Sequence, residues 1–214
     1  MEEILEYQEG RHIWFTSDLH LGHDKEFIWK ARGYMNVNHM NDTILYNLRS
    51  DVKPNDRLFI LGDLMLGGAD TNPQIFLPQL PKQATIILGN HDTAKREEAY
   101  RAYFEGGVFD TRRLRYKARD GKIYHFYLSH YPTLTANYDD EQKPLSARVL
   151  NLFGHTHQAY MHFMDSSNEI NPYMFHVGVD SHFCFPYEIE NIIELTKIIS
   201  KNYEELKEKE NKNA

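Results

Sequence analysis

The sequence has few of the features that mark secreted, membrane or disulfide-linked proteins. Cys184 is the single cysteine among 214 residues, so no disulfide can form within the chain. No run of about 18 apolar residues is present, which argues against a membrane-spanning helix. Residues 1–6 are acidic, whereas a secretory signal begins with basic residues and continues with apolar ones. We therefore expect a cytoplasmic protein without a membrane partner.

Positive charge is also scarce. The chain has 24 Lys and Arg against 31 Asp and Glu, a formal net charge of −7, which argues against an extended nucleic-acid surface. The 41% apolar share is that of an ordinary globular protein. We expect one domain over residues 1–207, followed by a disordered polar tail over 208–214. The oligomeric state stays open.

Apolar periodicity predicts the main elements. Six short apolar runs are typical of buried strands, at residues 12–16, 58–61, 85–88, 124–128, 149–153 and 174–177. Helical spacing predicts helices over residues 38–49, with Asn38 as the cap, 95–104 and 187–207. Residues 165–171 are expected to form a hairpin loop. This order indicates an α/β sandwich with mixed sheets.

Potential metal ligands follow five of these apolar runs directly. They are Asp18 and His20, Asp63, Asn90 with His91 and Asp92, His130, and His155 with His157. Ligands of open α/β sheets bind beyond the carboxyl ends of the strands, so these residues are expected to share one site. If the strands extend through both pairs two apart, Asp18 and His20, and likewise His155 and His157, point to one face.

The chemistry of these side chains favours a transition metal. Nitrogen and oxygen ligands without a thiolate suit Mn, Fe, Zn, Ni or Co better than calcium or a structural zinc site. One ion rarely uses seven such ligands, whereas two divalent ions sharing a carboxylate would use them economically. Glycines stand before Asp63, Asn90 and His155, where they let the backbone turn sharply beside a crowded site.

The five blocks together resemble the calcineurin-like metallophosphoesterases. That family's pattern is Asp-x-His, Gly-Asp, Gly-Asn-His-Asp or Glu, a lone His, and Gly-His-x-His, and every block occurs in this order here. The segment 177–180 also resembles small single-domain bacterial and bacteriophage members. If the chain is phage-encoded, its place would be the host cytoplasm. The resemblance covers about residues 12–195 and implies a four-layer α-β-β-α sandwich of two mixed sheets.

The resemblance also implies a role for each matched residue. Asp18, His20 and His157 would bind a first divalent metal, Asn90, His130 and His155 a second, and Asp63 both. His91 would face the scissile phosphate and act on the leaving oxygen, with Asp92 holding its ring. A hydroxide bridging the ions would attack phosphorus in line with the leaving group. Two divalent ions and two carboxylates leave a formal site charge of about +2, which favours an anionic ester.

Several functions fit this site. The leading hypothesis is a phosphodiesterase acting on a small or nucleotide-like ester, with Mn the ion of choice for an assay. A phosphomonoesterase and a nuclease for short nucleic acids are alternatives, and a non-catalytic scaffold fits least. His23 is a candidate for substrate contact, although a surface-loop histidine without a role in the site is an equally good interpretation. Arg148 is a second candidate, within the expected specificity loops 65–84 and 133–148.

Overall fold

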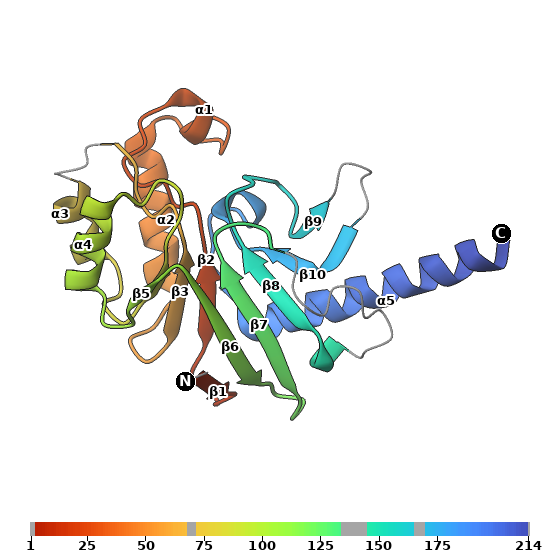
Figure 1. Ribbon diagram of the computed structural model, residues 1–214. Coiled ribbons are helices and arrows are strands. Elements are labelled where there is room, and N and C mark those ends of the chain that lie inside the picture. Colours follow the sequence, from red (N-terminus) through yellow and green to blue (C-terminus); the bar gives the residue numbers. More distant parts are fainter. Residues whose placement is uncertain (1–2, 68–71, 134–144, 165–169, 214) are drawn as a thin grey trace.

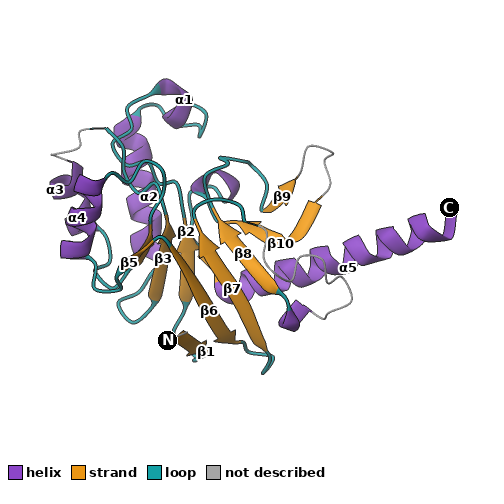
Figure 2. Ribbon diagram, in the orientation of Figure 1, coloured by secondary structure: helices purple, strands orange, loops and turns teal. Residues whose placement is uncertain are grey.

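Two mixed β-sheets with flanking helices form the protein (Figures 1 and 2). The computed structural model describes residues 3–67, 72–133, 145–164 and 170–213. Within these ranges no helix has both the length and the apolar character needed to cross a membrane. The two sheets lie face to face, and one hydrophobic core fills the space between them while a second core lies under the helices.

The first sheet has five strands and carries three of the helices. Its order is β11 (Tyr187–Glu188), β2 (Ile13–Thr16), β3 (Arg57–Leu61), β4 (Thr85–Ile87) and β5 (Val108–Phe109). All neighbours are parallel except β11 and β2. One face packs against α2 (Val37–Asp51), α3 (Asn72–Phe76) and α4 (Ala94–Tyr103). The short helix α1 (Glu26–Trp29) lies before α2.

The second sheet has six strands and is bordered by the long C-terminal helix. Its order is β1 (Glu3–Glu6), β6 (Thr111–Lys117), β7 (Ile123–Ser129), β8 (Val149–Phe153), β10 (Ile170–His176) and β9 (His162–Met164). Helix α5 (Ile189–Asn213) contacts β10 and buries Ile192 and Ile193 in the core between the sheets. Three 3-10 turns complete the described chain: η1 (Leu77–Gln79), η2 (Leu145–Ala147) and η3 (Val179–Ser181).

The six strands expected from the sequence are all present, but several helix boundaries differ. The helix expected from residue 187 begins at Ile189, because Tyr187 and Glu188 pair with β2 as strand β11. Asn36 caps α2 in place of Asn38, because its side chain accepts from the backbone of His39 at 2.9 Å. The expected tail 208–214 is helical as far as Asn213, since Lys- and Glu-rich sequence favours helix. Strands β9 and β10 pair antiparallel as the predicted hairpin requires, while residues 165–169 of its loop lie outside the described residues.

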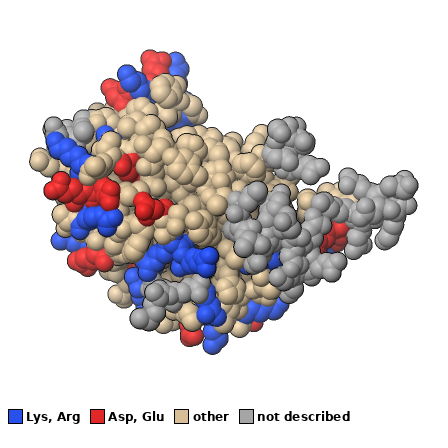
Figure 3. All heavy atoms as spheres, viewed as in Figure 1, with Lys and Arg blue, Asp and Glu red and all other residues tan. Residues whose placement is uncertain are grey.

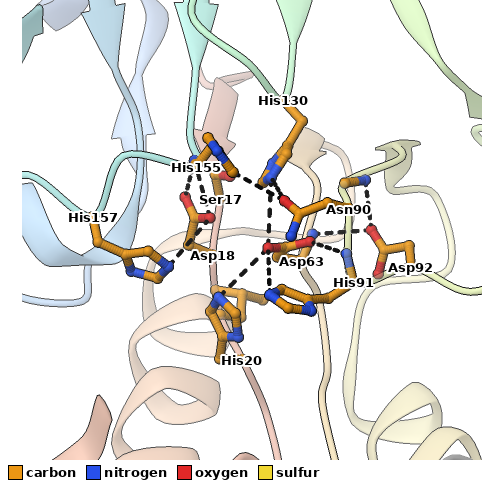
Figure 4. Close-up of polar contacts among 12 residues, drawn as sticks. Ser17, Asp18, His20, Asp63, Asn90, His91, Asp92, His130, His155 and His157 are labelled. Carbon is orange, nitrogen blue, oxygen red and sulfur yellow. Dashed lines mark hydrogen bonds and ion pairs between the residues drawn. The ribbon is translucent and has the colours of Figure 1, made fainter. Parts of the chain in front are cut away.

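The topology brings five strand ends to one place. Parallel β2, β3 and β4 of the first sheet and parallel β7 and β8 of the second end at the same edge of the sandwich, where their carboxyl ends meet (Figure 4). The polar residues that follow these strands therefore converge from both sheets.

Candidate metal centre

Two buried carboxylates form the middle of the convergence. Asp18 is 0% exposed and Asp63 2%. The Oδ2 atom of Asp63 lies 3.6 Å from Nε2 of His20 and 3.5 Å from Nε2 of His130. Nε2 of His157 lies 4.0 Å from Oδ1 of Asp18. Within the described residues, two triads, Asp18 with His20 and His157 and Asp18 with Asp63 and His130, each hold their ligand atoms within 4.8 Å of one another.

Asn90 joins two further histidines to this cluster. Its Oδ1 atom lies 2.9 Å from Nε2 of His130 and 2.9 Å from Nδ1 of His155. Nδ1 of His130 is 2.9 Å from the carbonyl oxygen of Leu61. When Nδ1 donates to that carbonyl, Nε2 is left as a lone-pair donor facing Asp63 and Asn90. All seven predicted ligands thus lie in one cluster (Figure 4).

Five of the seven ligand candidates have a left-handed backbone. The φ angles are +56° for Asp18, +49° for His20, +52° for Asp63, +67° for His155 and +48° for His157. Such angles are uncommon for residues other than glycine and concentrate at functional sites. They also correct one expectation, because β2 and β8 end before these residues. Left-handed turns, rather than extended strands, place these side chains in the cluster.

Two glycines are required by the closeness of the loops. A Cβ atom added at Gly154 would collide with the side chains of Ser17 and Asp18, and one at Gly62, whose φ is +91°, would collide with His130. The glycines before Asp63 and His155 predicted a crowded site at these positions, and the packing confirms the crowding.

The electrostatics of the cluster fit a bound cation. Burial raises the pKa of Asp18 to about 6, against the lowering influence of His130 and His157. Burial, followed by the charge of His157, lowers the pKa of His20 to about 2, so its ring is neutral. Both ring nitrogens of His20 are buried without a hydrogen-bond partner among the described residues. A divalent ion would neutralise the charge of the buried carboxylates and accept the lone pair of a ring nitrogen of His20. Uncharged neighbouring groups cannot supply that charge.

A buried ion pair holds one of the candidate ligands from behind. Nδ1 of His157 lies 2.9 Å from Oδ2 of Asp180. Arg32, whose side chain is 3% exposed, donates to both oxygens of Asp180 at 2.8 and 3.0 Å and to the carbonyl of Asp18 at 2.8 Å. The hydrogen bond with Asp180 raises the pKa of His157. Burial alone would raise the pKa of Asp180, but His157 and Arg32 hold it below its ordinary value.

Sequence reasoning missed the role of this pair. Asp180 stood out only through the family-like segment 177–180, and nothing marked Arg32. The two residues are 148 positions apart, and only the fold brings them together.

His91 and Asp92 lie beside the cluster, but not as the resemblance implies. Nε2 of His91 is 4.0 Å from Oδ2 of Asp63, and its side chain is 42% exposed, which leaves the ring open to a ligand. Asp92 does not hold that ring. Its Oδ2 accepts from the backbone of Asp63 and Gly89 at 2.9 Å each, and its Oδ1 accepts from the hydroxyl of Tyr100 at 3.0 Å. Asp92 therefore fixes the turn that carries His91.

The structure separates the two candidates for substrate contact. The ring of His23 lies 5.4 Å from that of His20, centroid to centroid, so His23 borders the cluster. Arg148 lies at the opposite end of β8, is 2% exposed, and stacks over Tyr173 at 4.2 Å. The fold therefore does not bring Arg148 to the site. Residues 68–71 and 134–144 of the expected specificity loops lie outside the described residues.

Comparison with known proteins adds a family to this geometry. Residues 11–184 match the family model described as calcineurin-like phosphoesterase. The chain is 32% identical to the Gene 66 protein of Mycobacterium phage D29, over 79% of this chain and 88% of that protein. It is 30% identical to the Gene 66 protein of Mycobacterium phage L5, over 78% and 86%. A crystal structure of a protein of unknown function from Aquifex aeolicus matches with a TM-score of 0.58 and 25% identity, over 87% of this chain and 100% of that one.

Proposed function

This chain belongs to the calcineurin-like phosphoesterase family, and from that premise we propose that it is a dinuclear-metal-dependent phosphodiesterase for small or nucleotide-like esters. The observation that carries the proposal is the convergence of seven residues with nitrogen or oxygen donors, two of which are the buried carboxylates of Asp18 and Asp63. Five of these residues have a left-handed backbone conformation. Such strain costs conformational energy and persists mainly where a functional site requires it.

Two groups of donors suit two ions. Asp18, His20 and His157 would hold one ion, Asn90, His130 and His155 the other, with Asp63 between them. When bound, divalent ions supply an activated water near neutral pH and neutralise charge on the phosphoryl oxygens. The donor set suits Mn, Fe, Zn, Co and Ni alike, and manganese is the ion that we would supply first in an assay.

We propose that His91 acts as the general acid that protonates the leaving oxygen. Its backbone N–H donates to Oδ1 of Asp63 at 2.9 Å, which anchors the residue to the centre of the site, while the ring stays partly exposed. A general acid must reach the substrate, and His91 combines anchorage with access without being assigned to either ion.

Exposed aromatic rings beside the site favour an ester with a flat group. Tyr131 is 48% exposed, and its ring centroid lies 4.7 Å from that of His155. Phe27 is 69% exposed and meets the ring of His23 edge-on at 5.6 Å. Large apolar side chains left open at both borders of a polar cluster suit a substrate that carries a nucleobase or aryl group.

The test compares a diester with a monoester. Protein stripped with a chelator and resupplied with Mn²⁺ is assayed on bis(p-nitrophenyl) phosphate and on p-nitrophenyl phosphate, beside His91→Ala. We expect metal-dependent preference for the diester and a loss of about 10²–10⁴-fold in the variant, with its metal content unchanged. Metal loss in His91→Ala would contradict the role given to that ring.

Other outcomes would replace the proposal. Preference for the monoester makes the protein a phosphatase. Absence of both turnover and bound metal would favour a non-catalytic scaffold. The nuclease alternative draws support from the Lys- and Arg-rich outer face of strands β6 and β7.

A further inference from the structure

Strands β6 and β7 have one buried face and one open face. Leu114, Tyr116 and Phe126 point into the core between the sheets, and each is at most 2% exposed. Because side chains alternate along a strand, their neighbours point outward. Among the outward residues, which also include Thr111 and Ile123, we call Arg113, Arg115, Lys117, His125 and Tyr127 the basic face. Within the described chain no α-helix is drawn in front of this face, and Lys and Arg gather there (Figures 2 and 3).

The charge of the basic face is not neutralised. Among the described residues neither Arg113 nor Arg115 forms an ion pair with a carboxylate, and Nε of Arg115 is buried without a hydrogen-bond partner. Lys117 approaches Glu6 only at 3.9 Å across an exposed edge, a pair that contributes little.

Aromatic rings alternate with these cations. Arg113 pairs with Tyr127 and Arg115 with His125 across the antiparallel ladder. Directly opposite residues share a face with their Cβ atoms roughly 5 Å apart. Tyr127 and His125 are half-buried, and neither side chain has a hydrogen bond among the described residues. Cations interleaved with open rings suit unpaired nucleotides, whose phosphates need charge and whose bases need a stacking surface.

The basic face leads to the metal centre. Tyr127 stands on β7 three positions before His130, which follows directly after the strand ends, a distance of roughly 10 Å along the extended chain. Beyond it, the exposed Tyr131 is held in place, because its carbonyl accepts from Ser129 Oγ at 2.7 Å and Thr133 Oγ1 at 3.0 Å. The fully buried Asn151 donates to Ser129 Oγ at 2.8 Å and anchors this network.

We propose that the basic face binds single-stranded nucleic acid and directs it to the metal centre, so that the substrate is a short single-stranded oligonucleotide. The inference deepens the proposed phosphodiesterase function and rests on it. Phosphates contact Arg113 and Arg115, and bases stack on Tyr127 and Tyr131. A duplex fits poorly, because its bases are already paired and stacked. Net charge pointed away from such a surface because it averages over the whole chain, whereas strand alternation concentrates cations on one face.

Fluorescence anisotropy of the full chain with a labelled oligo-dT across a salt series tests the inference, in Mn²⁺ and again in EDTA. The variant is Arg113→Gln/Arg115→Gln. Its charge-matched control is Arg49→Gln/Lys201→Gln on α2 and α5. We expect the variant to lose roughly tenfold in affinity, with a salt slope smaller by about 1.4 for two lost phosphate contacts. The control should bind as the unaltered protein does.

A second variant separates stacking from charge. Tyr127→Leu should lower affinity for the oligonucleotide at least about fivefold while leaving affinity for inorganic polyphosphate unchanged. Normal oligonucleotide binding by Tyr127→Leu, with equal competition from polyphosphate, would reduce the face to a general polyanion surface and overturn the assignment. Thermal unfolding midpoints check that each variant folds.

The remaining outcomes distinguish this inference from the proposed function. Unchanged binding by Arg113→Gln/Arg115→Gln, or an equal loss in the control pair, refutes the basic face. Binding in EDTA without hydrolysis of any ester in Mn²⁺ refutes the phosphodiesterase and leaves the face standing. Hydrolysis of bis(p-nitrophenyl) phosphate without face-dependent binding refutes the face alone.

Discussion

Replacing Asp180 with asparagine tests whether the ion pair behind His157 tunes metal binding. Oδ1 of Asp180 accepts from Nε of Arg32, and Oδ2 accepts from Nη2 of Arg32 and lies 2.9 Å from Nδ1 of His157. Asparagine has the same shape but a single oxygen. Its NH₂ group must therefore face a donor from Arg32 or from His157, and at least one hydrogen bond is lost.

The structure sets the expected size of the effect. Loss of a carboxylate that orients a metal-bound histidine typically weakens metal affinity by about 10–100-fold, or roughly 1.4–2.7 kcal/mol. Arg32 would also keep a buried charge without its partner, which costs about 3–5 kcal/mol when a pair is fully enclosed. We expect the free energy of unfolding to fall by about 3 kcal/mol, at the lower end of that range. The reason is that Asp180 is 16% exposed and Arg32 keeps its hydrogen bonds to the carbonyls of Asp18 and Leu19.

Calorimetric titration with Mn²⁺ and urea unfolding of the metal-free protein measure the two effects separately. Asp120→Asn is the matched control, because Asp120 also accepts from a cation and a tyrosine hydroxyl, but at the distant surface. Metal affinity in Asp180→Asn equal to that of the control would refute the reasoning, even if stability fell. The pair would then be a structural brace without influence on the ligand.

Three further changes test other parts of the molecule. Asp63→Asn should weaken binding of each ion at least about tenfold, measured as metal content after dialysis, because it removes the carboxylate shared by both groups of donors; full occupancy would argue against the shared position. Gly154→Ala should lower both metal content and stability, the latter by about 1–3 kcal/mol, because its Cβ collides with the neighbouring loop. The control for metal content is Gly121→Ala, whose Cβ meets nothing within 4 Å; its φ of +80° strains the backbone, but far from the cluster, so it should keep its metal. Burial lowers the pKa of His162 to about 4, so the folded chain resists the proton that the unfolded chain takes up near its ordinary value of 6.5. This loss of stability is absent above pH 6.5 and grows as pH falls towards 4, reaching at most about 3 kcal/mol. The free energy of unfolding, measured with urea at a series of pH values, should therefore fall less steeply below pH 6.5 in His162→Phe. An equally steep fall in that variant would assign the acid sensitivity to other groups.

The sequence predicted the site's members because each follows an apolar run. Asp63 and His130, for instance, come from different sheets, yet both stand just beyond a buried strand, and parallel strands end at a common edge. The way the side chains converge was not predictable from spacing. Asp18 and His20 point to one place through left-handed turns, which propensity does not foresee in residues other than glycine.

Contacts between distant segments were also beyond the sequence. Arg32 belongs to the loop before α2, and only folding places its guanidinium against Asp180. Arg148 showed the reverse failure, because its charge suggested a phosphate contact but its position at the start of β8 buries it far from the strand's carboxyl end. The basic face escaped notice because β6 was not predicted, and without its pairing to β7 the alternation of Arg113 and Arg115 carries no direction.

The order in which the ligands occur along the chain has a consequence for biosynthesis. Asp18 leaves the ribosome early, but the other histidine that shares its proposed ion, His157, and the Asp180 behind it come from the last third of the 214 residues. A nascent chain therefore carries an incomplete set of donors through most of its synthesis. The complete set of proposed ligands would therefore be in place only once both sheets have assembled, so selection among metals would rest with the finished protein rather than with a growing fragment.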